Sequence, residues 1–109
     1  YSYNGIVAPH SHNLFLQIVC DAGIAALIVF VILLFVYFRM MCSAFSREKD
    51  WTSRMLQTAC ISGVCGFMVQ AMTDYSFYNY RLMFFFWAFL ALGAASTRRS
   101  QLPEGRLLA

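Results

Sequence analysis

The sequence predicts an all-α membrane protein with about three transmembrane helices. Hydrophobic residues make up 61% of the 109-residue chain and charged residues 12%, whereas ordinary soluble domains average about 45–50% and about 25%. Three apolar runs come close to the roughly 17–25 residues that a helix needs to cross a bilayer. Basic residues gather between the first two runs and after the third. A chain of this length is expected to form one domain, residues 1–109.

The first predicted span covers about residues 12–38 and contains the charge-free stretch AGIAALIVFVILLFVYF. A soluble core helix is the competing interpretation, but so small a chain could not cover this stretch on all sides. Pro9 is poorly placed inside a helix, and Ser11 is a good N-cap residue. The helix is therefore expected to begin at His12, after a loop end at residues 1–11.

The other two predicted spans are weaker. The second, at about residues 55–72, is long enough but only weakly apolar. It carries small residues at four-residue spacing, which let membrane helices approach closely: Ala59 with Gly63, and Ser62 with Gly66. The third, at about residues 80–97, needs its flanking residues to cross the bilayer. The tail, residues 98–109, is short and contains Pro103 and Gly105, so we expect it to be disordered.

The distribution of basic residues predicts the orientation. Residues 39–54 contain Arg39, Arg47, Lys49 and Arg54, and the tail contains Arg98, Arg99 and Arg106. The connection at residues 73–81 contains Arg81 as its single basic residue. Short cytoplasmic loops accumulate Lys and Arg, so residues 39–54 and the tail are expected in the cytoplasm, and residues 1–11 and 73–81 outside. No basic patch alternates with aromatic residues on a soluble face, and no nucleic-acid partner is expected.

The N-terminus reads as part of a loop and lacks an initiating methionine. It also lacks the basic segment followed by an apolar core that marks a signal peptide. We therefore expect the chain to be a fragment of a longer membrane protein.

Metal binding is not favoured. The cysteines lie in or beside apolar runs without C-x-x-C spacing, and we interpret them as buried thiols: Cys20, Cys42, Cys60 and Cys65. His10 and His12 form a His-x-His pair, but the sequence places no third ligand beside them.

Polar residues gather at the predicted outer end. Asn13, Gln17 and Asp21 follow i, i+4, i+8 spacing, so on a helix they form one stripe that leads from the histidines into the first apolar run. Polar groups at this depth are costly unless they face protein or a wet cavity. Asp74 and Arg81 lie on the same side, where they could instead pair or cap helix ends.

His12 is the candidate for chemistry. In the first helical turn, the positive end of the helix dipole would disfavour its protonated form. A neutral imidazole can accept a proton, as a general base must. The same helix end would offer backbone N–H groups to an anion such as a diphosphate. The structural alternative is that the histidine lies at the membrane interface without a chemical role.

The stretch HSHNLFLQIVCDAGI, residues 10–24, resembles the signature of the bacterial O-antigen ligase and polymerase-like family. The family pattern is His, then Asn, Ser or Gln, nine residues and Gly, which matches His12, Asn13 and Gly23. The family usually places Gly, Thr or Tyr shortly after that glycine, where this chain has Ile-Ala-Ala. The later stretch DYSFYNYRLMFFFW, residues 74–87, resembles the family's last periplasmic turn and final helix.

The resemblance implies the C-terminal part of a polytopic glycosyltransferase of the bacterial inner membrane, with GT-C-like architecture. Such enzymes transfer a glycan from undecaprenyl diphosphate to a hydroxyl of a lipid, glycan or protein acceptor, without metal or other cofactor. His12 would be the general base. The candidates for substrate binding are His10, Asn13, Gln17, Asp74 and Arg81.

Two other functions stay open at this point. A fragment of a polysaccharide or lipid transporter or flippase would use its polar groups to line a path instead of performing chemistry. Such a protein is expected to carry intramembrane charges in more than one helix, or a broken helix. A structural membrane segment without a site is the third possibility.

Overall fold

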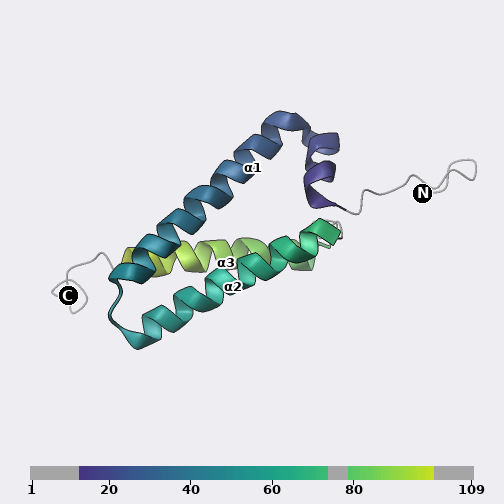
Figure 1. The fold of residues 1–109 in the computed structure, drawn as a ribbon. Helices are drawn as coiled ribbons and strands as arrows, with labels where there is room; N and C mark the ends of the chain where they lie inside the picture. Colours follow the sequence, from purple (N-terminus) through teal and green to yellow (C-terminus); the bar gives the residue numbers. More distant parts are fainter. Residues whose placement is uncertain (1–12, 74–78, 100–109) are drawn as a thin grey trace, which may run out of the picture.

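The computed structural model describes residues 13–73 and 79–99. These residues form three helices and no strand (Figure 1): α1, Leu14–Arg47; α2, Trp51–Thr73; and α3, Tyr80–Arg99. The all-α prediction is confirmed. All three helices are long and apolar enough to cross a membrane, as expected of a multi-pass membrane protein.

Helix α1 is broken at Gly23, which differs from the single span expected over residues 12–38. Gly23 has φ 82° and ψ 172°, in a region of backbone conformation that is essentially restricted to glycine. The break divides α1 into a short leg, residues 14–22, and a long leg, residues 24–47. At 1.5 Å per residue the long leg is about 36 Å long, which still exceeds the roughly 30 Å of a hydrocarbon core.

The long leg continues through Arg47, nine residues beyond the expected end of the first span. Arg39 lies on an exposed face of this helix, so its charge does not interrupt the helical backbone. The connection to α2 is therefore only residues 48–50. Within it, Glu48 Oε1 accepts hydrogen bonds from the backbone N–H groups of Lys49 and Asp50.

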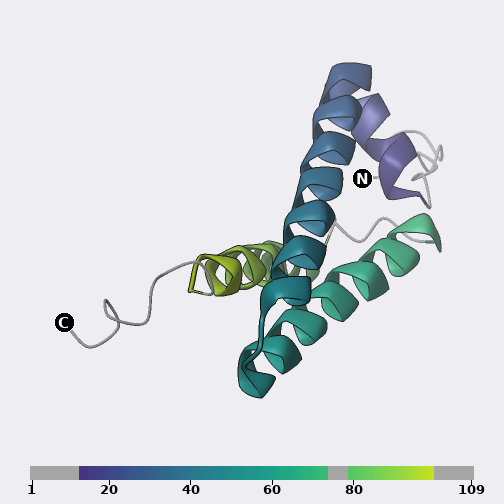
Figure 2. The ribbon, with the colours of Figure 1, turned by 60° about the vertical axis from the view of Figure 1, so that its left-hand side comes forward.

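The two ends of the helix bundle differ in chemistry. We call the end that contains Asn13, Thr73 and Tyr80 the site end, and the opposite end, which contains Arg47, Trp51 and Arg98, the basic end. Toward the site end, the long leg diverges from α2 and α3 (Figure 1). The short leg turns back from Gly23 and meets the end of α2 in both views (Figure 2). It therefore lies across the site end rather than extending the span.

Aromatic rings fill the space between the two legs of α1 and the other helices. The ring centroids of Phe15 and Phe30 are 6.4 Å apart, although 15 residues of straight helix would separate the two residues by about 22 Å. Phe30 in turn lies 6.0 Å from Phe86 of α3, which lies 4.6 Å from Phe67 of α2. Lipid supplies no hydrophobic drive between helices, so such packing contacts hold the fold together.

A glycine lets a side chain of α1 lie against the backbone of α3. The Tyr37 hydroxyl donates a hydrogen bond to the backbone oxygen of Phe89 at 3.3 Å. A Cβ built on Gly93 would clash with this hydroxyl. Two of the small residues expected to aid packing in α2 differ in their surroundings. A Cβ built on Gly63 would lie 3.3 Å from atoms of the Phe89 ring, whereas a Cβ built on Gly66 would have no atom within 4 Å.

Replacing Gly93 with alanine is expected to destabilise the bundle, because the new methyl group would displace the Tyr37 side chain from its contact with α3. Overpacking of this kind costs about 1–3 kcal/mol. Gly66→Ala is the matched control, since open space surrounds that position. Both variants can be compared by denaturant titration in detergent micelles. Equal stabilities of the two variants would contradict the assigned contact.

Candidate functional site

Three of the predicted site residues lie in the described part of the chain: Asn13, Gln17 and Arg81. The other three, His10, His12 and Asp74, lie outside the described residues. The immediate sequence neighbours of His12 and Asp74 are both at the site end, since Asn13 precedes α1 and Thr73 ends α2. The site is therefore built from these anchoring residues.

Asn13 is the N-cap of α1. Its Oδ1 accepts hydrogen bonds from the backbone N–H groups of Phe15 at 2.9 Å and Leu16 at 3.3 Å. This differs from the expected cap at Ser11 and helix start at His12, and the reason is that Asn and Ser are comparably good caps. His12 thus precedes the cap rather than occupying the first turn. The helix-dipole argument for a neutral imidazole does not apply to this helix start.

The Asn13 side chain also joins two helices. Its Nδ2 donates a hydrogen bond of 3.4 Å to the backbone oxygen of Met72, 59 residues away. That carbonyl belongs to the last turn of α2, where backbone oxygens lack a partner within the helix. The Asn13 amide therefore supplies hydrogen-bond partners both to backbone N–H groups at the start of α1 and to a backbone oxygen at the end of α2. It fixes where the chain enters the short leg.

The spacing of the sequence motif has a structural explanation. Asn13 caps the short leg, the nine following residues form it, and Gly23 ends it with its glycine-only conformation. No atom lies within 4 Å of a Cβ built on Gly23, so the backbone dihedral angles rather than lack of space favour glycine. A helix of nine residues between a cap and a break accounts for the interval between Asn13 and Gly23.

Two of the three residues of the predicted stripe, Gln17 and Asp21, lie on the short leg, whereas Asn13 precedes it as the cap. The Gln17 Nε2 donates a hydrogen bond of 2.8 Å to Asp21 Oδ1. Asp21 is exposed and lies two residues before the break, which accounts for an acid within an otherwise apolar run. An amide and a carboxylate held side by side present the hydrogen-bonding groups that suit sugar hydroxyls.

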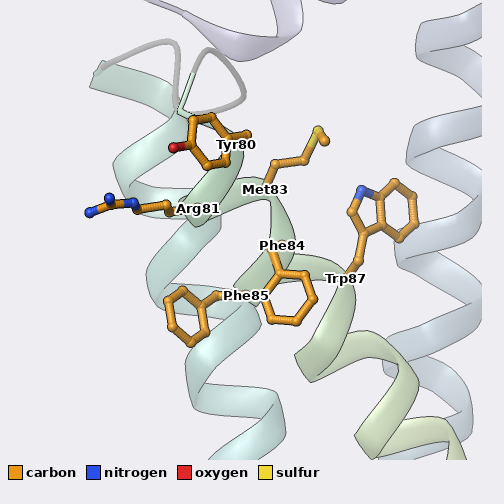
Figure 3. Close-up of a pocket in the computed structure, with 6 residues that line it drawn as sticks. All are labelled: Tyr80, Arg81, Met83, Phe84, Phe85 and Trp87. Carbon is orange, nitrogen blue, oxygen red and sulfur yellow. The ribbon is translucent and has the colours of Figure 1, made fainter.

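Arg81 lies in the first turn of α3 and is exposed. Its backbone N–H donates to Asn79 Oδ1 at 3.1 Å. It lines an open hollow of about 620 Å³, whose other lining residues are apolar or aromatic (Figure 3): Tyr80, Met83, Phe84, Phe85 and Trp87. The guanidinium extends away from Met83 and Trp87 (Figure 3). The sequence interpretation did not single out this hollow, although the run of aromatic residues was its signal.

The cysteines only partly match their interpretation as buried thiols. Cys60 is buried, whereas Cys20, Cys42 and Cys65 are exposed. The exposed ones lie on faces that could contact lipid or further helices, so their burial was overestimated for an isolated bundle. Within residues 13–73 and 79–99, no group of three His, Cys, Asp or Glu side chains is arranged to hold a metal ion.

Comparisons of the chain with protein-family models, with curated proteins and with solved structures find no match. A functional proposal therefore depends on the sequence motif and on the geometry of the site end.

Proposed function

We propose that the chain is the C-terminal part of a bacterial inner-membrane glycosyltransferase. The enzyme transfers a glycan from undecaprenyl diphosphate to an acceptor hydroxyl at the outer face. The observation that carries this proposal is the local structure of the motif. Its Asn is a helix cap, its nine-residue interval is the short leg, and its Gly has a conformation restricted to glycine. The residues that carry the resemblance thus have defined structural roles in this chain, as a helix cap and as a helix break.

In this proposal His12 acts as the general base. It removes the proton of the acceptor hydroxyl, whose oxygen attacks the anomeric carbon of the carrier-linked glycan. The bond from that carbon to the carrier's oxygen breaks, and undecaprenyl diphosphate leaves with the electron pair. A diphosphate is already a good leaving group, so the protein needs to orient the acceptor, remove its proton and neutralise charge.

The surrounding residues have supporting roles. Asn13 anchors the backbone next to His12 through its bonds to both α1 and Met72. The paired Gln17 and Asp21 orient sugar hydroxyls, and Arg81 contributes positive charge at the same end. His10 and Asp74 are further candidates for substrate binding. Acceptor and donor would meet above the short leg.

The depth of the short leg suits a lipid-linked substrate. The long leg alone is long enough to cross a bilayer, which puts Gly23 near one membrane surface. The short leg would then lie at the level of the headgroups, where a polyprenyl carrier keeps its diphosphate. A general base next to the start of that leg is at the same level.

A transporter is the second candidate, because broken helices are typical of transport sites. The break at Gly23 is the specific feature that favours it. However, the long leg is continuous, and no Asp, Glu, Lys or Arg occurs between residues 24 and 38. A break at the end of a span, next to the polar Asp21, fits a surface site better than a path through the membrane.

The deciding experiment uses the full-length protein in proteoliposomes with an undecaprenyl diphosphate oligosaccharide and a glycan acceptor. A transferase forms a new glycosidic bond and releases undecaprenyl diphosphate, also in the presence of EDTA. Movement of the intact lipid-linked sugar across the bilayer without a new bond would instead support the transporter.

The proposed orientation predicts a labelling pattern. In intact cells, a cysteine at position 76 of a cysteine-free protein should react with a membrane-impermeant maleimide. Cysteines that replace Arg54 and Arg98 should react only after permeabilisation, because basic loops remain inside. The reverse pattern would contradict the orientation.

A further inference from the structure

We propose that the basic end is a binding surface for anionic phospholipid headgroups, with Arg54 at its centre. This inference is independent of glycan transfer. All three helices and the connection between α1 and α2 contribute exposed basic side chains there: Arg39, Arg47, Lys49, Arg54 and Arg98. Two acidic residues, Glu48 and Asp50, lie at the same end. The five cations therefore outnumber the two anions among the described residues of this end.

Arg54 is held in a defined position. Its guanidinium carbon lies 4.5 Å from the centroid of the Phe45 ring, so a residue of α2 is stacked on a residue of α1. A cation–π contact of this kind uses none of the N–H groups along the edge of the planar guanidinium. That edge is the part of arginine that binds phosphate oxygens in pairs.

One oxygen of each acidic side chain is engaged with the backbone. Glu48 Oε1 accepts from the N–H groups of Lys49 and Asp50, and Asp50 Oδ2 accepts from the N–H group of Ser53 at 2.8 Å. The Asp50 bond caps the start of α2, and the two bonds to Glu48 lie within the connection. One oxygen of each carboxylate thus serves the tight connection, and the basic side chains are exposed.

The position of these residues relative to the membrane surface favours an anionic lipid over a soluble acidic protein as the binding partner. Trp51 is 73% exposed at the first position of α2, and exposed tryptophan is typical of the interface between lipid and water. Arg39 lies eight residues before Arg47, about 12 Å deeper along the helix. Its side chain must extend back toward the headgroups. Phosphate groups are at this level, whereas a cytosolic protein would have to displace lipid to reach Arg39.

The test uses the full chain reconstituted in nanodiscs that contain phosphatidylcholine with phosphatidylglycerol as the minor lipid. Native mass spectrometry should show preferential retention of phosphatidylglycerol. In R54Q the preference should fall about fivefold, which corresponds to about 1 kcal/mol for one basic residue near an anionic surface. Phe45→Leu keeps every charge and should lower the preference less, because only the stacked geometry is lost.

The control is Q70A, which removes an exposed polar side chain near the site end of α2 and should leave the retained lipids unchanged. Circular dichroism establishes that each variant remains helical. Equal retention of the two lipids by the original protein, or an unchanged preference in R54Q, would overturn the proposal. Loss of preference in Q70A to the same extent as in R54Q would also overturn it, since the effect would then not belong to the basic end.

Discussion

Replacing Gly23 with alanine is expected to abolish glycan transfer by straightening the start of α1. The observed backbone conformation costs a residue with a Cβ about 1–3 kcal/mol. Alanine is also the best helix former, by about 1 kcal/mol over glycine within a helix. Both effects favour one continuous helix through position 23. Straightening would separate Phe15 from Phe30 and remove the Asn13 bond to Met72, so the described anchor next to His12 would be lost.

The measurement is the amount of polysaccharide product in cells that express the full-length variant at normal abundance. Gly66→Ala is again the matched control, because it also adds one methyl group to an apolar helix but meets no atom within 4 Å. It should leave transfer unchanged. Unimpaired transfer by Gly23→Ala would show that the break is not needed for function.

Replacing His12 with alanine is expected to abolish transfer while membrane insertion and protein abundance stay intact. Loss of a general base typically slows a reaction by roughly 10²–10⁴-fold, which is enough to remove a glycan ladder from a gel. The hydrogen bonds of Asn13 to Phe15, Leu16 and Met72 do not involve the imidazole. The defect should therefore appear in activity and not in stability.

His10→Ala is the comparison for that experiment. It removes an identical side chain two residues earlier, so a general effect of losing a histidine would appear equally in both variants. A milder defect is expected for His10→Ala. A normal glycan ladder from the His12 variant would exclude the base role.

The three spans were predictable because hydropathy and basic residues are properties of the chain that need no tertiary contacts. The extension of α1 through Arg47 was not, since Arg39 and its neighbours read as the start of a loop. Exposed basic residues are good helix formers, and the helix ended instead at Arg47, with Glu48 as the C-cap whose backbone N–H donates to the backbone oxygen of Ala44. The first basic residue after the apolar run therefore did not predict the position at which the helix ends.

The site was predictable only in part. The i, i+4 relation of Gln17 and Asp21 held because it depends on local helical geometry alone. The start at Leu14 and the break at Gly23 depended on partners distant in sequence. Asn13 and Ser11 are both good N-cap residues. Asn13 is the observed cap, and it also contacts Met72. Gly23 follows Ala22 within an apolar run, where a glycine reads as a tolerated helical residue.

The site end and the proposed function both depend on the bend that brings the two legs of α1 together. Its direct test is cross-linking of cysteines at positions 15 and 30 by a short bifunctional thiol reagent, in a full-length protein whose native cysteines are replaced. The 6.4 Å between the Phe15 and Phe30 rings predicts efficient cross-linking within one molecule, and its loss when Gly23→Ala is added. Absence of the cross-link in the protein that keeps Gly23, as for residues about 22 Å apart on a straight helix, would contradict the account.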